Sequence, residues 1–197
     1  MDSHFYLGTS NVVVPLRQRD FPEPFRGASR LTYYASLLNS VEVNSTFYKL
    51  PQPATVARWA TEVPPHFRFT FKLYKAITHA KGLQFSATDV AAFMAAIAGA
   101  AAHKGTILIQ LPPSAKWDKL YQLQALLEII TQHNNDGWPL AVEFRHASWY
   151  HPETYRLLEL HHTAVVVHDK RGAVTPILQS AQNFMYLRFH GPDGRYG

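Results

Sequence analysis

Polar side chains recur at alternate positions of several apolar segments, the pattern of strands with one polar face. The segment VEVNSTFYKLP, residues 41–51, places Glu42 and Asn44 between valines. The same alternation occurs at Lys72, Gln110, Glu143, Arg145, Arg188 and His190. Because successive side chains of a strand point to opposite faces of its sheet, we expect these residues to share one face.

This polar set is suited to acid–base chemistry on an anionic substrate. With Asp169 it holds three acids and three basic side chains, and charges removed from water are costly unless they are paired. We expect catalytic roles for Glu42, Glu143, Lys72, His79 and His190. We expect substrate contacts from Asn44, Gln110, Arg145, Trp149, Asp169 and Arg188. An arginine can hold a planar anion through two hydrogen bonds.

Other interpretations of these residues remain open. Glu143 and Arg145, two apart on one strand, could simply pair with each other, and interior ion pairs also occur without any chemistry. Lys72 could be an imine-forming nucleophile, an anion contact or a structural ion-pair partner. His79, in the loop segment ITHAKGL, could transfer protons or be an ordinary solvated loop residue.

The remaining histidines and the aromatic residues give weaker signals. His146 and His168 fall on the opposite, outward phase of their segments and are interpreted as packing residues. His79, His190, Glu42 and Asp169 could be imagined around a metal, but no ligand motif joins them, so no metal is expected. Aromatic residues that could stack on a ligand or anchor loops follow three strands: Phe47, Tyr48, Tyr74, Trp149 and Tyr150.

The elements that must position these residues alternate between strand and helix patterns. Strands are predicted at 5–10, 40–45, 67–73, 106–112, 140–146, 163–169 and 184–191. Apolar stripes of helical period occupy 31–38, 56–63, 90–97, 120–130 and, more weakly, 157–160. This alternation indicates a parallel sheet with helical crossovers, either open or closed into a barrel.

The face pattern favours the barrel. Strands of an open α/β sheet are covered by helices on both faces and read as continuous apolar runs, whereas these strands alternate. No G-x-G-x-x-G or Walker-type motif follows a strand, so no cofactor is assigned. We therefore predict a single α/β domain over residues 1–197, a TIM-type (β/α) barrel with its polar set at the carboxyl ends of the strands, where barrel enzymes place their active sites.

Composition limits the alternatives. The 197 residues carry 19 Lys and Arg against 14 Asp and Glu, a formal charge of +5 without a basic run. That charge suits an anionic small molecule, while nucleic-acid binding is only weakly supported. Cysteine is absent, and there is no signal peptide or apolar segment of the roughly 20 residues that a membrane span takes. We expect a cytoplasmic protein without membrane contact.

Several motifs, in this order and spacing, resemble one known family. They are VEVNSTFYKLP, FTFKLYKAITH, ILIQLPPS, VEFRHASW, the aspartate that closes VVVHD, and YLRFHG. The chain resembles the YecE-like family, the domain of unknown function number seventy-two, from about residue 5 onward. The resemblance implies a TIM-type barrel of bacterial or archaeal origin without an established activity. It also implies that the polar residues above, with His146, are characteristic family positions.

The chain departs from the family pattern at both ends. Ser10-Asn11-Val12 stands where the family usually has a Gly-Trp pair after the first strand. The family continues past the R-x-H-G segment with a helix and a final strand, whereas this chain stops at Gly197. Seven strands leave two unpaired edges. We expect a barrel that is incomplete at its C-terminus, through truncation or through a strand supplied by another copy.

Two hypotheses for function follow. The first is an enzyme that acts on a small anionic or sugar-like substrate, with hydrolase, lyase and isomerase chemistry all open. The second is a non-catalytic module that binds a nucleic acid or protein. Positive charge funnelled into the strand ends would favour the first, and a broad outer stripe of charge would favour the second.

Overall fold

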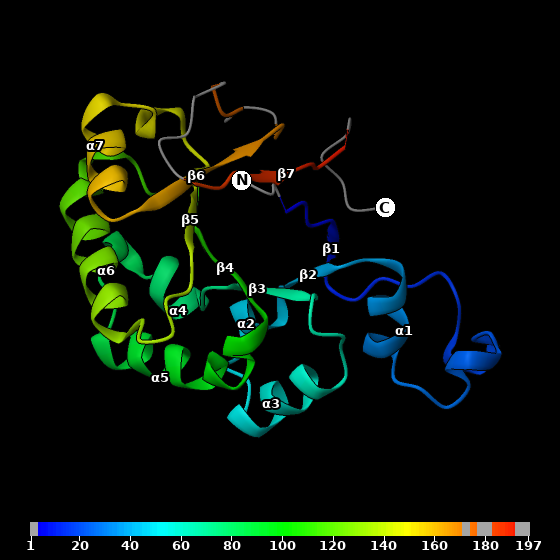
Figure 1. The fold of residues 1–197 in the computed structure, drawn as a ribbon. Helices are drawn as coiled ribbons and strands as arrows, with labels where there is room; N and C mark the ends of the chain where they lie inside the picture. Colours follow the sequence, from blue (N-terminus) through cyan, green and yellow to red (C-terminus); the bar gives the residue numbers. More distant parts are fainter. Residues whose placement is uncertain (1–3, 171–173, 177–182, 192–197) are drawn as a thin grey trace.

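The structure, a computed structural model, describes residues 4–170, 174–176 and 183–191. Within these residues, seven parallel strands form one sheet in the order of the sequence, from β1 to β7. The sheet curls into a half-barrel (Figure 1). Its strands are β1 Gly8–Ser10, β2 Ser40–Val43, β3 Arg68–Lys72, β4 Lys104–Gln110, β5 Leu140–Glu143, β6 Thr163–His168 and β7 Tyr186–Arg188.

The main helices connect successive strands on the outer side of the sheet (Figure 1). The α-helices are α1 Arg30–Leu37, α2 Ser45–Tyr48, α3 Pro53–Thr61, α4 Lys75–Thr78, α5 Ala87–Ile97, α6 Leu120–His133 and α7 Pro152–Leu160. The 3₁₀ helices are η1 Gln18–Asp20, η2 Glu23–Phe25, η3 Lys81–Leu83, η4 Ala98–His103, η5 Trp117–Lys119 and η6 Ala147–Trp149. The side chain of Ser29 caps α1, because its Oγ accepts a hydrogen bond of 3.0 Å from Thr32 N.

Apolar residues separate into an outer and an inner cluster. The outer cluster joins Phe69, Phe71 and Val142 of the strands to residues such as Phe93 of α5 and Leu127 of α6. A smaller inner cluster fills the concave side of the sheet with Leu108, Ala141, Ala164 and Val166. The alternating strands therefore bury both faces, and the polar residues lie beyond the inner cluster, at the strand ends.

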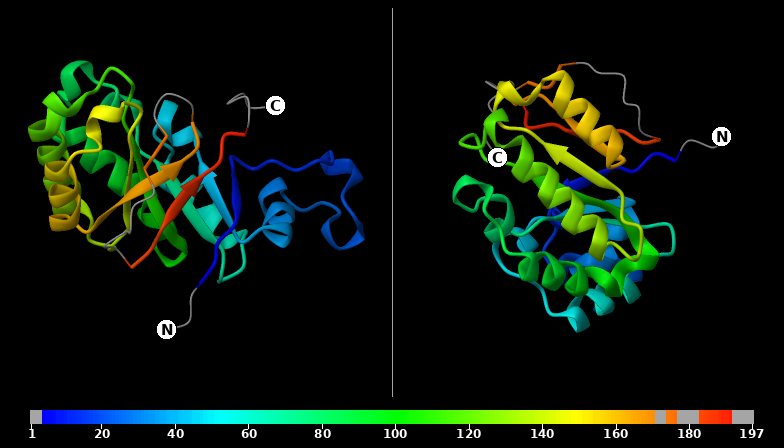
Figure 2. Two further views of the ribbon diagram at one scale, coloured as in Figure 1. Left: turned by 90° about the horizontal axis from the view of Figure 1, so that it is seen from above. Right: turned by 90° about the vertical axis from the view of Figure 1, so that its left-hand side faces the viewer.

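The two edge strands are held differently. The Gly8 position of β1 admits no side chain, because an added Cβ would lie 2.2 Å from the carbonyl oxygen of Ser40 on β2. At the other edge, β7 pairs with β6, and Figure 2 shows it between β6 and β1. No strand pairing joins β7 to β1 among the described residues.

The α/β class and the parallel sheet are confirmed, and closure of the barrel is not. Strands occupy every predicted segment, and all but the first end sooner than predicted; the second stops at Val43, so Asn44 belongs to the turn into α2. The short helices α2 and α4 stand where loops were expected. The expectation about the chain's last residues, 193–197, lies outside the described residues. No helix within the described residues is long and apolar enough to cross a membrane.

Candidate active site

The sheet gathers its polar residues at the carboxyl ends of the strands. Lys72, Gln110, Glu143 and Arg188 are each the last residue of a strand. Glu42 is the second-last residue of β2, and Arg145 and His190 stand two positions beyond β5 and β7. We call these seven residues the polar cluster. Because the sheet is curved, residues from its two edges meet there.

Arg188 joins two carboxylates that come from distant strands. Its Nε donates to Oε2 of Glu42 at 2.9 Å, and its Nη2 donates to Oε1 at 2.8 Å, which makes a two-pronged contact. Its Nη1 donates to Oε2 of Glu143. All three side chains are at least nine-tenths buried. Burial alone would lower the pKa of Arg188, but Glu42 and Glu143 offset this and raise it, so the guanidinium stays charged.

Both carboxylate oxygens of Glu42 accept hydrogen bonds. Besides Arg188, Oε1 accepts from Ser10 Oγ at 3.0 Å, and Oε2 accepts from the hydroxyl of Tyr186 at 2.8 Å. Burial and the charge of Glu42 raise the pKa of Tyr186 well above its ordinary value, so the phenol keeps its proton and remains a donor. Residues of β1 and β7 therefore hold one carboxylate of β2 in place.

Glu143 is similarly occupied. Gln110 Nε2 donates to its Oε1 at 3.1 Å, and Arg145 Nε forms an ion pair with the same oxygen. Burial would raise the pKa of Glu143, but Arg188 and Arg145 outweigh it and hold the pKa below its ordinary value. Two glutamates and two arginines thus balance one another's charge within the cluster.

His190 has a defined tautomer. A guanidinium can only donate, so the 3.1 Å contact between Arg145 Nη2 and His190 Nε2 makes Nε2 the acceptor. The proton of the neutral ring then lies on Nδ1, which donates to Asp169 Oδ1 at 3.2 Å. Asp169 also accepts from the His190 backbone N–H at 2.8 Å, which lowers the pKa of its carboxyl group. Burial and Arg145 lower the pKa of His190, which favours that neutral form.

Lys72 stands apart from this network. Its Nζ lies 4.2 Å from the centre of the Phe47 ring, and it makes no hydrogen bond or ion pair with any other described residue. Burial and the charge of Arg188 lower the pKa of Lys72 to about 8. Glu42 and Glu143 act in the opposite sense but are already neutralised by arginine. A half-buried ammonium whose one contact among the described residues is a cation–π contact, without a hydrogen bond or an ion pair, is a functional-site signal.

His79 lies beside Lys72. Its ring contacts the same Phe47 ring edge-on, with centroids 4.9 Å apart. Its Nδ1 and Thr78 Oγ1 are 2.9 Å apart. Burial lowers the pKa of His79, and the charge of Lys72 lowers it further. The structure therefore brings together an amine, a neutral imidazole and an aromatic ring at the end of β3.

Some of the predicted site residues lie elsewhere. Trp149 is fully buried behind the sheet, stacked on Phe144, and its Nε1 donates to the carbonyl oxygen of Ala115 at 2.8 Å. Asn44 lies in a helical turn, where its backbone N–H donates to Asn11 Oδ1 at 3.2 Å. Neither residue contacts the polar cluster through a hydrogen bond within the described part of the chain. Asp169 is at the rim, with 42% of its side chain exposed.

The interpretation of His168 as an outward packing residue was wrong. Its strand continues the inward phase of Ala164 and Val166, and its ring lies 5.9 Å from that of His190. Its Nε2 contacts the carbonyl oxygen of Phe144 at 2.8 Å, and burial lowers its pKa. His146 is partly exposed and caps η6, accepting from Ser148 N at 3.2 Å.

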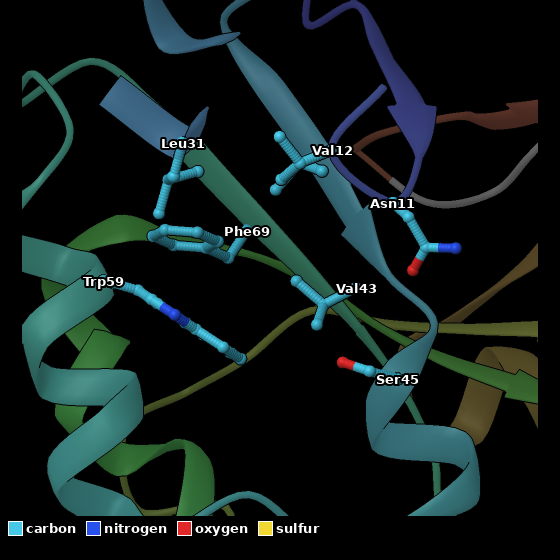
Figure 3. A pocket seen from close by; sticks show the side chains of 8 residues that line it. Asn11, Val12, Leu31, Val43, Ser45, Trp59 and Phe69 are labelled. Atoms are coloured by element: carbon cyan, nitrogen blue, oxygen red, sulfur yellow. The ribbon is translucent and has the colours of Figure 1, made fainter. Parts of the chain in front are cut away.

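Two hollows lie away from the polar cluster. One of about 180 Å³ lies on the outer side of β2 and β3, where Leu31, Trp59 and Phe69 form apolar walls and Asn11 and Ser45 lie at one end (Figure 3). The other is an open surface hollow beside Arg17 and Arg19. Neither contains a residue of the polar cluster.

Sequence comparison decides the family. The family described as "Protein of unknown function DUF72" matches residues 8–197. The chain belongs to the DUF72 family. This confirms the YecE-like resemblance. The chain is 31% identical over 140 residues to UPF0759 protein YecE of Escherichia coli K12, covering 71% of this chain and 50% of that protein. It is 25% identical over 197 residues to UPF0759 protein YunF of Bacillus subtilis, covering 88% and 69%.

Solved structures of DUF72 proteins share the fold. A crystal structure at 2.20 Å from Thermotoga maritima has a TM-score of 0.74 and 29% identity, covering 94% of this chain and 74% of that one. One at 2.52 Å from Enterococcus faecalis has a TM-score of 0.72 and 23% identity, covering 94% and 73%. The DUF72 chain spans about half the length of the E. coli relative. Neither the family nor these relatives are described with an activity.

Sequence reasoning missed several members of the site. Tyr186 shares the inward phase of Arg188, two residues away, and this was a usable signal for a cluster residue. Ser10 is the last residue of β1, and its position beside Glu42 follows only from the strand register, in which these two residues are paired. Phe47 was noted as one of several aromatic residues, but its contacts with both Lys72 and His79 depend on the short helix α2, which the sequence pattern did not predict.

Proposed function

We propose that this DUF72 chain is an enzyme that acts on a small anionic or sugar-like substrate by acid–base chemistry at the carboxyl ends of its strands. One observation carries the proposal: Lys72 lies half-buried beside a cluster of glutamates and arginines that is already paired within itself. The charge left unpaired on that side of the cluster is positive. A small anion would supply the partner that Lys72 lacks.

The glutamates serve a different role in this proposal from the one first expected. A general base needs a lone pair that is free to take a proton, and its pKa should lie near the working pH. Both oxygens of Glu42 and of Glu143 already accept bonds from cationic or hydroxyl donors, and the pKa of Glu143 is lowered. The two glutamates therefore fix the arginines and set the field around Lys72.

Proton transfer falls to Lys72 and the histidines. With a pKa of about 8, roughly a tenth of Lys72 is neutral at pH 7, so it can both give and take a proton. His79 is neutral at that pH, and its ring contacts the same Phe47 ring as Lys72 does. Arg145 would bind the anionic group, because its Nη1 makes no hydrogen bond within the described residues.

Anion binding measured by thermal shift and calorimetry tests the proposal. The probes are inorganic phosphate and a panel of small carboxylates and sugar phosphates. Binding should weaken at least tenfold in Lys72→Met. The matched control is Lys104→Met, which removes an exposed lysine at the opposite end of β4 and should bind as the parent does. Equal binding by all three proteins would overturn the proposal. Steeply salt-dependent binding of a polyanion alone would favour the non-catalytic module instead.

We also propose a closed barrel for the fold and a reducing, cytoplasmic location. The inward alternation of seven strands and the reach of Arg188 from β7 to β2 support closure, and a second copy of the chain is our candidate for pairing with the open edges. The absence of cysteine supports the location. Light scattering coupled to size exclusion tests the pairing: a monomer at all concentrations would contradict it.

A further inference from the structure

We infer that Lys72 is a covalent nucleophile that forms an imine with a small aldehyde or ketone carrying an acidic group. This inference rests on the proposed function, because it uses the same site, and it names the substrate class. Three geometric facts support it: the freedom of the Lys72 amine, the position of His79 and the donor left on Arg145.

The amine of Lys72 is free to react. Glu42 and Glu143 are the two acids whose charge acts on Lys72, and both are held by arginine. Arg188 binds both of them, and Arg145 binds Glu143. The amine instead lies over the face of the Phe47 ring at 4.2 Å, a cation–π contact that leaves its N–H donors without a hydrogen-bond acceptor among the described residues. Lysine nucleophiles are activated by burial and by neighbouring cations, and here Arg188 is the stronger of two such neighbours.

His79 is placed to move the protons of the reaction. The rings of His79 and Phe47 are in edge contact, so imidazole and amine stand at one aromatic ring. Thr78 Oγ1 donates to the carbonyl oxygen of Tyr74 at 3.5 Å, so it accepts a hydrogen bond from the N–H at Nδ1 of His79. His79 Nε2 then holds the lone pair of the neutral ring, and it makes no hydrogen bond within the described part of the chain. The neutral imidazole can therefore accept a proton at Nε2 and return it.

The step balances with one proton from solvent water. The lone pair of Lys72 Nζ attacks the carbonyl carbon, and the carbonyl π pair moves to oxygen. His79 takes the proton that the nitrogen loses and passes it to the oxygen, giving a neutral carbinolamine. His79 then takes a second proton from solvent and gives it to the departing hydroxyl, water leaves, and the nitrogen lone pair forms the C=N bond. The resulting iminium can stabilise negative charge on the adjacent carbon.

Arg145 is the residue that would bind the acidic group of the substrate. Its Nε is paired with Glu143 and its Nη2 with His190, which leaves Nη1 without a partner among the described residues. A carboxylate or a phosphate on the carbonyl compound would take this donor. The shared chemistry is therefore a carbonyl with a nearby anion, as in a 2-oxo acid or a phosphorylated aldehyde.

Reductive trapping tests the inference. The full chain is incubated with sodium cyanoborohydride and glyoxylate, pyruvate, glycolaldehyde phosphate or uncharged acetaldehyde, and the modified lysines are mapped by peptide mass spectrometry. Lys72 should be labelled at least tenfold faster than Lys75 or Lys104, and faster by an anionic probe than by acetaldehyde. Comparison of the carboxylate and phosphate probes identifies the anion. Arg145→Gln should remove the preference for anionic probes.

Each outcome has a defined meaning. Selective labelling of Lys72 that disappears in Lys72→Met and persists in Lys104→Met supports the imine. Equal labelling of all exposed lysines overturns it. If labelling is unselective but phosphate still stabilises the parent and not Lys72→Met, the imine fails while the acid–base site stands. If labelling is unselective and phosphate also fails to stabilise the parent over Lys72→Met, the proposed function is overturned as well.

Discussion

Arg188 on β7 and Glu42 on β2 form a two-pronged ion pair across the open side of the half-barrel, although 146 positions separate them in the sequence. A third contact from the same guanidinium reaches Glu143 on β5. No backbone pairing connects β7 to β1 or β2 in the described part of the chain, so the side chains of Arg188 and Tyr186 supply the connection that hydrogen-bonded strands would otherwise make.

Removing Arg188 should destabilise the protein severely. Arg188→Leu leaves Glu42 and Glu143 buried without their shared counter-charge, and breaking such a pair costs about 3–5 kcal/mol. Urea unfolding measures the change. Arg156→Leu on the exposed side of α7 is the control and should change stability by less than about 0.5 kcal/mol. Should Arg188→Leu fail to fold, Arg188→Lys, which keeps the charge and loses the two-pronged geometry, should fold with an intermediate loss.

Replacing Lys72 should stabilise the protein at pH 7. The pKa of Lys72 is about 8 in the folded state and about 10.4 in the unfolded chain. Because the folded pKa is the lower one, the unfolded chain binds the proton more tightly at pH 7, and charged Lys72 opposes folding. Lys72→Met should therefore raise the free energy of unfolding by about 1 kcal/mol after allowance for solvent screening. A loss of stability would show that Lys72 has a structural partner.

Stability should begin to fall below about pH 6.5, before the carboxylates titrate. Burial lowers the folded pKa of His168, so the unfolded chain takes up its proton first as the pH falls. The contribution of such a group is complete above the unfolded pKa and is lost as the pH falls through the folded pKa. His168→Gln should reduce this step in unfolding curves measured from pH 7.5 to 5. The exposed His133→Gln should leave it unchanged.

Substitutions of Trp149 test whether this residue belongs to the hydrophobic core or to the candidate active site. Its indole is fully buried on Phe144 and bonded to Ala115. Trp149→Ala should cost about 3–5 kcal/mol of stability, and Trp149→Phe should cost less because only the N–H bond and part of the volume are lost. Wherever these variants remain folded, their affinity for phosphate should equal that of the parent. A specific loss of affinity in Trp149→Phe would restore the substrate-contact role first expected for this residue.

Gly8 should tolerate no substitution. A Cβ at this position would meet the carbonyl oxygen of Ser40 at 2.2 Å, so Gly8→Ala must displace β1 from β2. The displacement would also draw Ser10 away from Glu42. We expect a loss larger than that of Ser10→Ala, which removes only one hydrogen bond to a charged group, worth about 1.5–3 kcal/mol. Unfolding midpoints of the two variants make the comparison.

Face alternation was sufficient to predict that Glu42, Glu143 and Arg188 meet, because the direction of a strand side chain follows from its position. The same rule failed where strands end. Asn44 turns into α2, and Asp169 leaves the strand after His168, so counting from Asp169 placed His168 on the wrong face. The burial of Trp149 depends on a distant loop at Ala115, which no local pattern contains. Closure of the barrel depends on edge pairing that local periodicity does not encode.

The three contacts of Arg188 connect the position of the edge strand β7 to the reactivity of the Lys72 amine. With β7 in place, Arg188 lowers the proton affinity of Lys72 and masks the two glutamates that would raise it. A molecule whose last strand had detached would expose Lys72 to two bare carboxylates, and the amine would hold its proton more firmly. An acylating reagent reacts with neutral lysine, so it would label Lys72 on β3 faster in molecules with β7 in place than in molecules with β7 detached.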